Sequence, residues 1–455
     1  MKTKLFCRGL IAISALACLT GCGPAAGSSD VISIYCWNEE FKGFFDKYVS
    51  DEKKAVSETD KVRHFEGKEV KWTVTPSDNG AYQDALDLAL KTQDISKEKV
   101  DMFLGEADYI QKYVNSDFTR DVTAIGVTDF SQAYEYTKQV ATDPNGVVKG
   151  MSFQACPSAM IYNRVIARDV YGSDDPAVIQ AKVDTWTKWL AVADEMKTEG
   201  YIMTGSESDS YRVFSNNAAE PWIVDETVAG AVKHMVRVPS IVKDWMTQAK
   251  TLFTKAETQT SDIWGSVKTN SLAKGEGEGA AAYAGKAFCT FGPAWYYNFC
   301  MSQCTAGDWA ICKGPMGHFW GGTWLLLPKG GDNDSEVAKI MNAFLTNEDV
   351  MRSLINNEGQ YPNHKAVCAE VGNSDHHNAF LGGQNDTKMF NEMVDSIEIK
   401  NTTMYDQHCN EFLQEQYRQF LNGTVTEKQA VTNLGIALKA KFATLDVSEI
   451  ANFLS

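Results

Sequence analysis

Two adjacent carboxylates, Glu39 and Glu40, are among the residues of this sequence that could do chemistry. A pair of carboxyl groups can supply the acid and the base of a glycosidase. Acidic residues also occur in the first turn of a helix, where the helix dipole favours them, and they can accept hydrogen bonds from hydroxyl groups. We rank the helix start and the hydroxyl acceptor equally and place catalysis third, because the sequence indicates no second catalytic partner.

Tryptophans and short polar residues in loops form a second set of candidates. The C–H face of a pyranose packs well against an indole ring, while its hydroxyl groups need polar partners at the rim. The aromatic candidates are Trp37, Trp264, Trp295, Trp320 and Trp324, and the polar ones are Asn38, Asp78, Asn79, Asp108, Gln154 and Asp209. Most tryptophans are core residues and short polar residues favour turns, so only the whole set indicates a site. Helical spacing places Trp186, Trp189 and Trp245 in the core.

The elements that would position these residues alternate between strand and helix. Residues 31–35, 70–74 and 100–104 have the pattern of strands, and amphipathic helices follow the first two. This order predicts a parallel sheet covered by helices on both faces. Ligands bind beyond the carboxyl ends of the strands in such sheets. The residues directly after these strands are Trp37 to Glu40, Asp78, Asn79, Glu106 and Asp108.

Later segments are mostly helical. Asp184 is expected to cap a helix that carries Trp186 and ends at Gly200. Near the C-terminus, Thr426 and Gln429 form a capping-box pair, which predicts a helix start.

The N-terminus predicts export and lipid attachment. Lys2, Lys4 and Arg8 precede an apolar run over residues 9–19 that is too short to span a bilayer. Residues 19–22, Leu-Thr-Gly-Cys, resemble the bacterial lipobox, in which a lipid is attached to the cysteine and the chain is cut before it. We therefore expect a lipoprotein signal peptide over 1–21, a tether over 22–29, and a lipid on Cys22. An ordinary secretory signal or a buried strand is the alternative.

Composition narrows the function further. The net charge of −16 is opposite to the basic footprint of nucleic-acid binders, and 455 residues suffice for two cores. Cys289, Cys300, Cys304 and Cys312 crowd one stretch, where we expect a disulfide or buried free thiols rather than a metal site. Neither a metal-binding nor a cofactor-binding motif occurs in the sequence.

Four further stretches resemble the extracellular solute-binding proteins of carbohydrate ABC importers, the group that includes maltose-binding protein. Residues 152–163 (SFQACPSAMIYN) resemble the first crossover between the two lobes of that family. Residues 287–295 (AFCTFGPAW) resemble the strand and turn that present an aromatic ring to sugar. Residues 319–324 (FWGGTW) resemble the return crossover, and the final helices resemble the C-terminal pair.

The resemblance implies a two-lobe α/β periplasmic-binding-protein-like fold, each lobe a mostly parallel sheet flanked by helices, with the ligand cleft between the lobes. It divides the chain into 30–153 plus 322–365 and 157–320 plus 369–455. The chain would cross between lobes near 154–157, 321–324 and 361–368. Gly321 and Gly322 supply flexible backbone there, and Gly322 joins the expected ligand-binding residues.

The resemblance also implies the function. We expect a monomeric, non-enzymatic protein that captures a sugar or oligosaccharide and delivers it to an ABC permease, while its lipid anchors it to the outer face of the bacterial cytoplasmic membrane. No cofactor, metal or nucleic acid is expected. The alternatives are a binder of another small solute such as a polyamine, a secreted glycoside hydrolase using Glu39 and Glu40, and a surface glycan adhesin.

Overall fold

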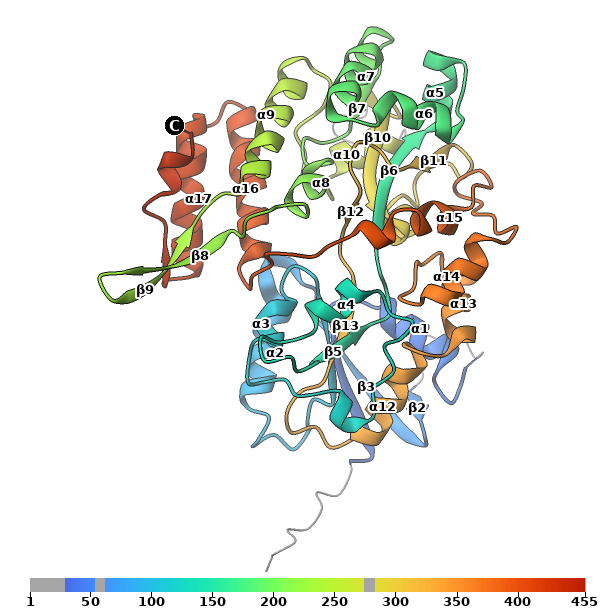
Figure 1. The fold of residues 1–455 in the computed structure, drawn as a ribbon, viewed down its shortest axis with the longest axis vertical. Coiled ribbons are helices and arrows are strands. Elements are labelled where there is room, and N and C mark those ends of the chain that lie inside the picture. Colours follow the sequence, from blue (N-terminus) through green and yellow to red (C-terminus); the bar gives the residue numbers. More distant parts are fainter. Residues whose placement is uncertain (1–28, 54–61, 274–282, 455) are drawn as a thin grey trace, which may run out of the picture.

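The computed structural model describes residues 29–53, 62–273 and 283–454 (Figure 1). The predicted signal peptide, Cys22 and the tether up to residue 28 lie outside the described residues. Two separate sheets, each with its own helices, form the lower and upper halves of the molecule in Figure 1. No helix among the described residues has the length and apolar character needed to cross a membrane.

The first sheet has six strands in the order β2-β3-β1-β4-β13-β5. Their bounds are β1 (Val31–Cys36), β2 (Arg63–Phe65), β3 (Lys68–Val74), β4 (Met102–Glu106), β5 (Gly150–Ser152) and β13 (Thr323–Leu326). β1 is parallel to both β3 and β4, as the alternating pattern predicts. Helices α1 (Glu40–Tyr48) and α2 (Ala81–Lys91) bury the apolar faces expected of them, including Phe41, Phe44 and Phe45 on α1.

The second sheet differs from the mostly parallel sheet that we expected. Its strands are ordered β11-β6-β10-β7, and β12 pairs with β6. Their bounds are β6 (Pro157–Asn163), β7 (Ile202–Thr204), β10 (Ala287–Pro293), β11 (Trp309–Cys312) and β12 (His318–Phe319). Only the β10–β7 pair is parallel, since β6 is antiparallel to β10, β11 and β12. Both sheets are therefore mixed.

The route of the chain explains these antiparallel strands. β6 follows β5 of the first sheet, and β13 follows β12 of the second sheet. Each of these two strands begins at the side of its sheet that faces the other sheet, which is where the C-terminal ends of β4 and β10 lie. A strand that starts on that side must run antiparallel to the strands that end there. β13 is accordingly antiparallel to β4 and β5, as β6 is to β10.

The remaining helices cover the two sheets. Their bounds are α3 (Ile110–Val114), α4 (Glu135–Val140), α5 (Arg164–Tyr171), α6 (Pro176–Val183), α7 (Trp186–Thr198), α8 (Tyr211–Ser215), α9 (Ser240–Thr254), α10 (Ser266–Ala273), α12 (Asp334–Ala343), α13 (Glu348–Glu358), α14 (Lys365–Gly372), α15 (Asp386–Asn391), α16 (Asp406–Leu421) and α17 (Glu427–Lys441). Strands β8 (Ile223–Val228), β9 (Ala231–Val236) and β14 (Leu445–Asp446) form a third, small sheet.

Local helix signals are confirmed with one correction. Thr426 and Gln429 form the expected capping box of α17. The prediction that Asp184 caps α7 is wrong, because the Thr185 hydroxyl accepts the hydrogen bond from the Lys188 backbone N–H. Asp and Thr are both favoured N-cap residues, and here Thr185 has the extended backbone of the cap position.

Buried residues form two hydrophobic clusters. The first surrounds the first sheet and continues onto the second sheet through residues such as Ala159, Ile161 and Trp309, and the second contains the alternate residues of the second sheet, such as Met160 and Tyr162. Trp189 and Trp245 are fully buried in the second, as expected, while Trp186 is partly buried and stacks on Phe214. The eight described cysteines are all free. Cys289 and Cys312 are therefore buried thiols, and the expected alternative of a disulfide is not formed.

The two consecutive crossovers between the sheets have unusual backbone. Cys156 in the first has φ +51°, and Gly321 and Gly322 in the second have φ +71° and +110°. A Cβ at Gly322 would lie 3.2 Å from the Trp324 ring. The left-handed conformation and the close approach both require glycine at this position.

Candidate functional site

A cavity of about 1220 Å³ lies between the two sheets and is lined by elements of both. The segments after β1 and β4 form one wall, and the segment after β10 forms part of the other. The predicted residues that line it are Trp37, Asn38, Glu39, Glu40, Asp78, Asp108, Gln154, Trp264, Trp295, Trp320 and Gly322. The site thus forms where the carboxyl ends of strands from both sheets meet.

Three predicted residues are placed differently. Asp209 does not line the cavity, because it is fully buried and its carboxylate lies 2.8 Å from the Lys268 ammonium. Trp324 is also outside the lining, 1% exposed, and its indole N–H donates to the Thr137 carbonyl at 2.8 Å. Asn79 belongs to the short helix η1 (Asp78–Gly80), but its side chain lies outside the described part of the chain.

The two adjacent glutamates have different surroundings. Glu39 stands at the start of α1, is exposed, and pairs with Lys42 at 2.6 Å. The half-buried Glu40 carboxylate accepts hydrogen bonds from the side-chain amides of Gln154 and Gln360, each at 3.2 Å. Burial raises the pKa of Glu40 to about 7, which these two hydrogen bonds oppose. Glu40 therefore ties the start of α1 to the first crossover.

An aromatic cluster forms the wall contributed by the second sheet. The Trp320 ring lies 5.2 Å from Trp295, 5.7 Å from Trp264 and 5.4 Å from Tyr296, measured between centroids. Trp264 is 57% exposed and Trp320 only 5%, so Trp264 is the accessible ring of the cluster and Trp320 is its buried support. On the opposite wall, Trp37 packs edge-on against Tyr82 and Tyr109.

A buried ion pair supports this cluster from behind. The Lys268 ammonium contacts both the Asp209 carboxylate and the Tyr296 hydroxyl. Asp209 also accepts hydrogen bonds from the Thr290 hydroxyl at 2.6 Å and the Ser206 N–H at 2.9 Å. Asp209 thus fixes the ring that holds Trp320, although it does not face the cavity.

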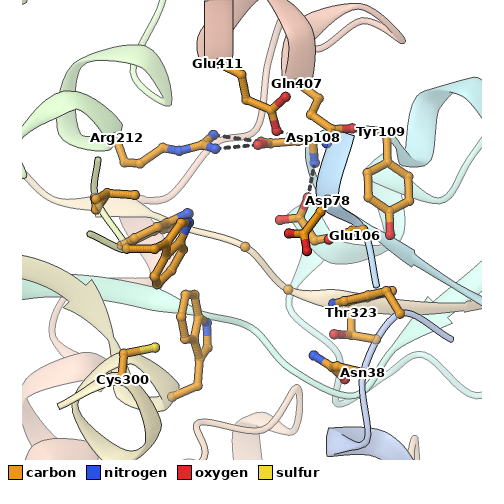
Figure 2. A pocket seen from close by; sticks show the side chains of 18 of the residues that line it. Asn38, Asp78, Glu106, Asp108, Tyr109, Arg212, Cys300, Thr323, Gln407 and Glu411 are labelled. Atoms are coloured by element: carbon orange, nitrogen blue, oxygen red, sulfur yellow. Dashed lines mark hydrogen bonds and ion pairs between the residues drawn. The ribbon is translucent and has the colours of Figure 1, made fainter. Parts of the chain in front are cut away.

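A second ion pair spans the cavity between the two sheets. Asp108 follows β4 of the first sheet, and Arg212 belongs to α8 beside the second. The guanidinium binds both carboxylate oxygens, with Nη1 2.8 Å from Oδ1, and the side chains are only 16% and 13% exposed (Figure 2). Arg212 also lies 5.9 Å from the centre of the Trp320 ring. Bidentate geometry makes this a strong contact.

Glu106 lies beside this ion pair. One of its oxygens accepts a hydrogen bond from the Asp108 backbone N–H at 2.9 Å. Burial and the negative charge of Asp108 raise the pKa of Glu106 to about 8, against the opposing effect of Arg212. Glu106 therefore holds a proton more readily than an ordinary glutamate, and a cation placed beside it would favour its charged form.

Sequence reasoning missed one complete wall of the cavity. Helix α16 contributes six side chains, Gln407, Glu411, Phe412, Gln414, Glu415 and Arg418. The spacing of residues 407, 411, 414 and 418 places them on one helix face, which is a detectable signal. Tyr109 and Arg212, which are close to strand ends or in short helices, were also missed. The described residues contain no group of three or more His, Cys, Asp or Glu side chains that could hold a metal ion.

Comparisons with known proteins agree with this architecture. The family pattern of the bacterial extracellular solute-binding proteins matches residues 62–378. No curated protein sequence is significantly similar to the chain. Among solved structures, an extracellular solute-binding protein of family 1 superposes with a TM-score of 0.67 at 17% identity, over 90% of this chain and 99% of that one.

Two similar structures contain sugars. A binding protein associated with an ABC transporter of B. animalis subsp. lactis, in complex with β-1,6-galactobiose, has a TM-score of 0.64 at 14% identity, over 90% of this chain and 97% of that one. A maltose-bound protein of T. maritima has a TM-score of 0.58 at 16% identity, over 90% and 100%. The expected two-lobe binding-protein fold is confirmed by these superpositions.

The family match covers well over half of the chain and includes residues of both walls. The family is one of binding proteins and not of enzymes, which contradicts the hydrolase alternative, although Glu39 and Glu40 themselves lie outside the matched residues. The chain belongs to the bacterial extracellular solute-binding proteins.

Proposed function

We propose that the protein is the lipid-anchored substrate-binding component of a bacterial ABC importer, and that its ligand is a sugar or oligosaccharide. The cavity carries the proposal, because it combines an exposed indole cluster with hydrogen-bonding side chains on the facing wall. Its 1220 Å³ exceed the ~300–1,000 Å³ of ordinary small-molecule sites, which favours more than one sugar ring. The sugars bound by two proteins of the same fold support the same class of ligand.

The residues have separate roles in this proposal. Trp264 and Trp295 stack on sugar rings, with Trp320 between them as support. The polar partners of the hydroxyl groups are Asn38, Glu40, Asp78, Asp108 and Gln154, with Trp37 as an apolar contact on the same wall. Asp209 and Trp324 hold the surrounding structure instead of touching the ligand.

Closure of two lobes would couple binding to delivery. The proposed lobes are residues 30–153 with 322–365, and 157–320 with 369–455, and the left-handed residues Cys156, Gly321 and Gly322 provide the hinge. A ligand contacts both lobes in the closed form and one in the open form, so it shifts the equilibrium toward closure. The permease then recognises the closed form. A lipid on Cys22 retains the monomeric protein at the outer face of the membrane, in an extracellular or periplasmic position.

A ligand screen tests this function. Purified full-length protein is heated with mono- and oligosaccharides and with polyamines, and hits are measured by calorimetry. A sugar present at a hundred times its Kd should add ~2.7 kcal/mol to the free energy of unfolding. It should bind one-to-one, and small-angle scattering should show a smaller radius with ligand. Failure of every sugar in the screen would contradict the proposal, and unchanged scattering with a tight ligand would contradict lobe closure.

A further inference from the structure

The lining of the cavity is strongly acidic. Eight carboxyl side chains line it against two guanidinium groups. Both guanidinium groups already have a carboxylate partner. Arg212 pairs with Asp108, and Arg418 Nε lies 2.7 Å from a carboxylate oxygen of Glu207, a residue that does not line the cavity. Within the described part of the chain, no ion pair joins Asp78, Glu106 or Glu411 to a basic side chain. These three carboxyl groups face the cavity without a positive partner.

The three carboxyl groups come from different elements and converge. Asp78 follows β3, Glu106 ends β4, and Glu411 lies on α16. Glu106 and Glu411 both lie close enough to Asp108 to feel its charge, and Figure 2 shows Asp78, Glu106 and Glu411 on the side of the cavity opposite the Arg212 stem. Burial and the negative charge of Asp108 raise the pKa values of both Glu106 and Glu411, so these two carboxyl groups and Asp108 repel one another. A cation placed among them would relieve that repulsion.

An unsatisfied hydroxyl group lies in the same wall. Tyr109 lines the cavity, is 4% exposed, and its hydroxyl has no hydrogen-bond partner among the described residues. Figure 2 shows this hydroxyl directed toward Thr323, another lining residue. A buried hydroxyl left unpaired costs ~1–3 kcal/mol, so this group points to a ligand atom that completes its hydrogen bonding.

The opposite wall is also suited to a positive charge. Indole faces attract cations through the ring quadrupole, and the guanidinium of Arg212 already lies 5.9 Å from the Trp320 ring centre. A thin polyamine chain would leave much of the 1220 Å³ unfilled and would present no ring face to Trp264 and Trp295. A sugar that carries an amine fulfils both requirements, since its ring stacks and its ammonium group meets the carboxylates.

We propose that the ligand is an amino sugar, or an oligosaccharide containing one, whose protonated amine binds among Asp78, Glu106 and Glu411. This inference rests on the proposed function and names its substrate class. The Tyr109 hydroxyl completes the subsite by hydrogen bonding to a ring or glycosidic oxygen of the same sugar.

Matched ligands separate the charge from the sugar ring. Calorimetry near neutral pH compares the β-1,4-linked glucosamine disaccharide with cellobiose and with its N-acetylated form, and galactosamine with galactose. The amine-bearing member should bind about tenfold or more tightly than its neutral counterparts. Glu106→Gln should reduce that preference, measured as the ratio of the two affinities, by about tenfold. Asp117→Asn, which removes a fully exposed carboxylate outside the cavity, should leave both affinities unchanged.

Each outcome is decisive. Equal or tighter binding of the neutral sugars overturns the amine subsite and leaves the proposed function standing. A preference for amines that survives in both Glu106→Gln and Glu411→Gln, with folding verified by circular dichroism, also overturns it. Binding of spermidine or putrescine without any sugar overturns the proposed function as well, as does binding of none of these probes.

Discussion

The ion pair between Asp108 and Arg212 is the contact whose removal should most clearly affect closure. On the proposed mechanism it joins the two lobes across the cavity. Arg212→Met keeps most of the aliphatic stem and removes the charge. Asp108 then faces Glu106 and Glu411 without its cation, but only in the closed form, because opening of the cavity returns it to water.

The size of the effect can be worked out from the geometry. Breaking a buried ion pair by removing one partner costs ~3–5 kcal/mol. The two side chains are still 16% and 13% exposed, so we take a lower value of about 2 kcal/mol for the closed form. If ligand binding requires closure, this corresponds to about a 30-fold higher Kd.

A double-mutant cycle is the assay. Calorimetry measures the Kd of the same sugar for wild type, Arg212→Met, Asp108→Asn and the double variant. The double variant should recover most of the affinity lost in Arg212→Met, since the unpaired carboxylate is gone. Thermal unfolding checks that every variant is folded. An Arg212→Met variant within threefold of wild type, or a double variant as weak as the single one, would refute the reasoning.

Three further perturbations address the aromatic wall, the anchor and the core. Trp295→Ala should weaken sugar binding by ~1–3 kcal/mol in calorimetry. Trp189→Ala should instead lower the free energy of unfolding by ~3–5 kcal/mol and leave the affinity per folded molecule unchanged. The opposite pattern would show that Trp189 contacts the sugar and Trp295 is a core residue. Cys22→Ala should move the protein from the membrane fraction to the soluble exported fraction, and continued membrane retention would contradict the lipid anchor. Burial lowers the pKa of His318 to about 3, so the unfolded chain binds its proton first as pH falls below ~6.5, and stability declines from there toward pH 3 by up to ~1.4 kcal/mol per unit. His318→Leu should lose that part of the slope in urea unfolding, and an identical slope would show that His318 does not contribute.

Much of the first sheet could be predicted from the sequence because its signals are local. Residues 31–35 and 70–74 lie within β1 and β3, and residues 100–104 overlap β4. The hydrophobic periodicity of a short stretch is enough to predict such a strand. The direction of β6 and β13 could not be predicted in the same way, because it depends on which sheet the chain has just left. That information is in the three-dimensional path and not in any short window.

The site was predictable where a rule links it to strand ends. Trp37, Glu40 and Asp108 lie in the cavity because parallel strands end there. The α16 wall escaped notice because a polar helix face has the same spacing whether it borders solvent or a cavity. Asp209 was wrongly expected in the cavity for a similar reason. The sequence around an aspartate in a loop looks the same whether its side chain faces a ligand or is buried against a lysine, as Asp209 is against Lys268.

The position of α16 has a consequence for the folding of the molecule. Of the described residues that line the cavity, those of α16 come last in the chain, while Trp37 comes first. The binding surface is therefore complete only after nearly the whole ordered chain has been assembled into one structure. An intermediate in which α16 has not yet docked lacks one wall of the cavity, so a solute stabilises it less than it stabilises the finished structure.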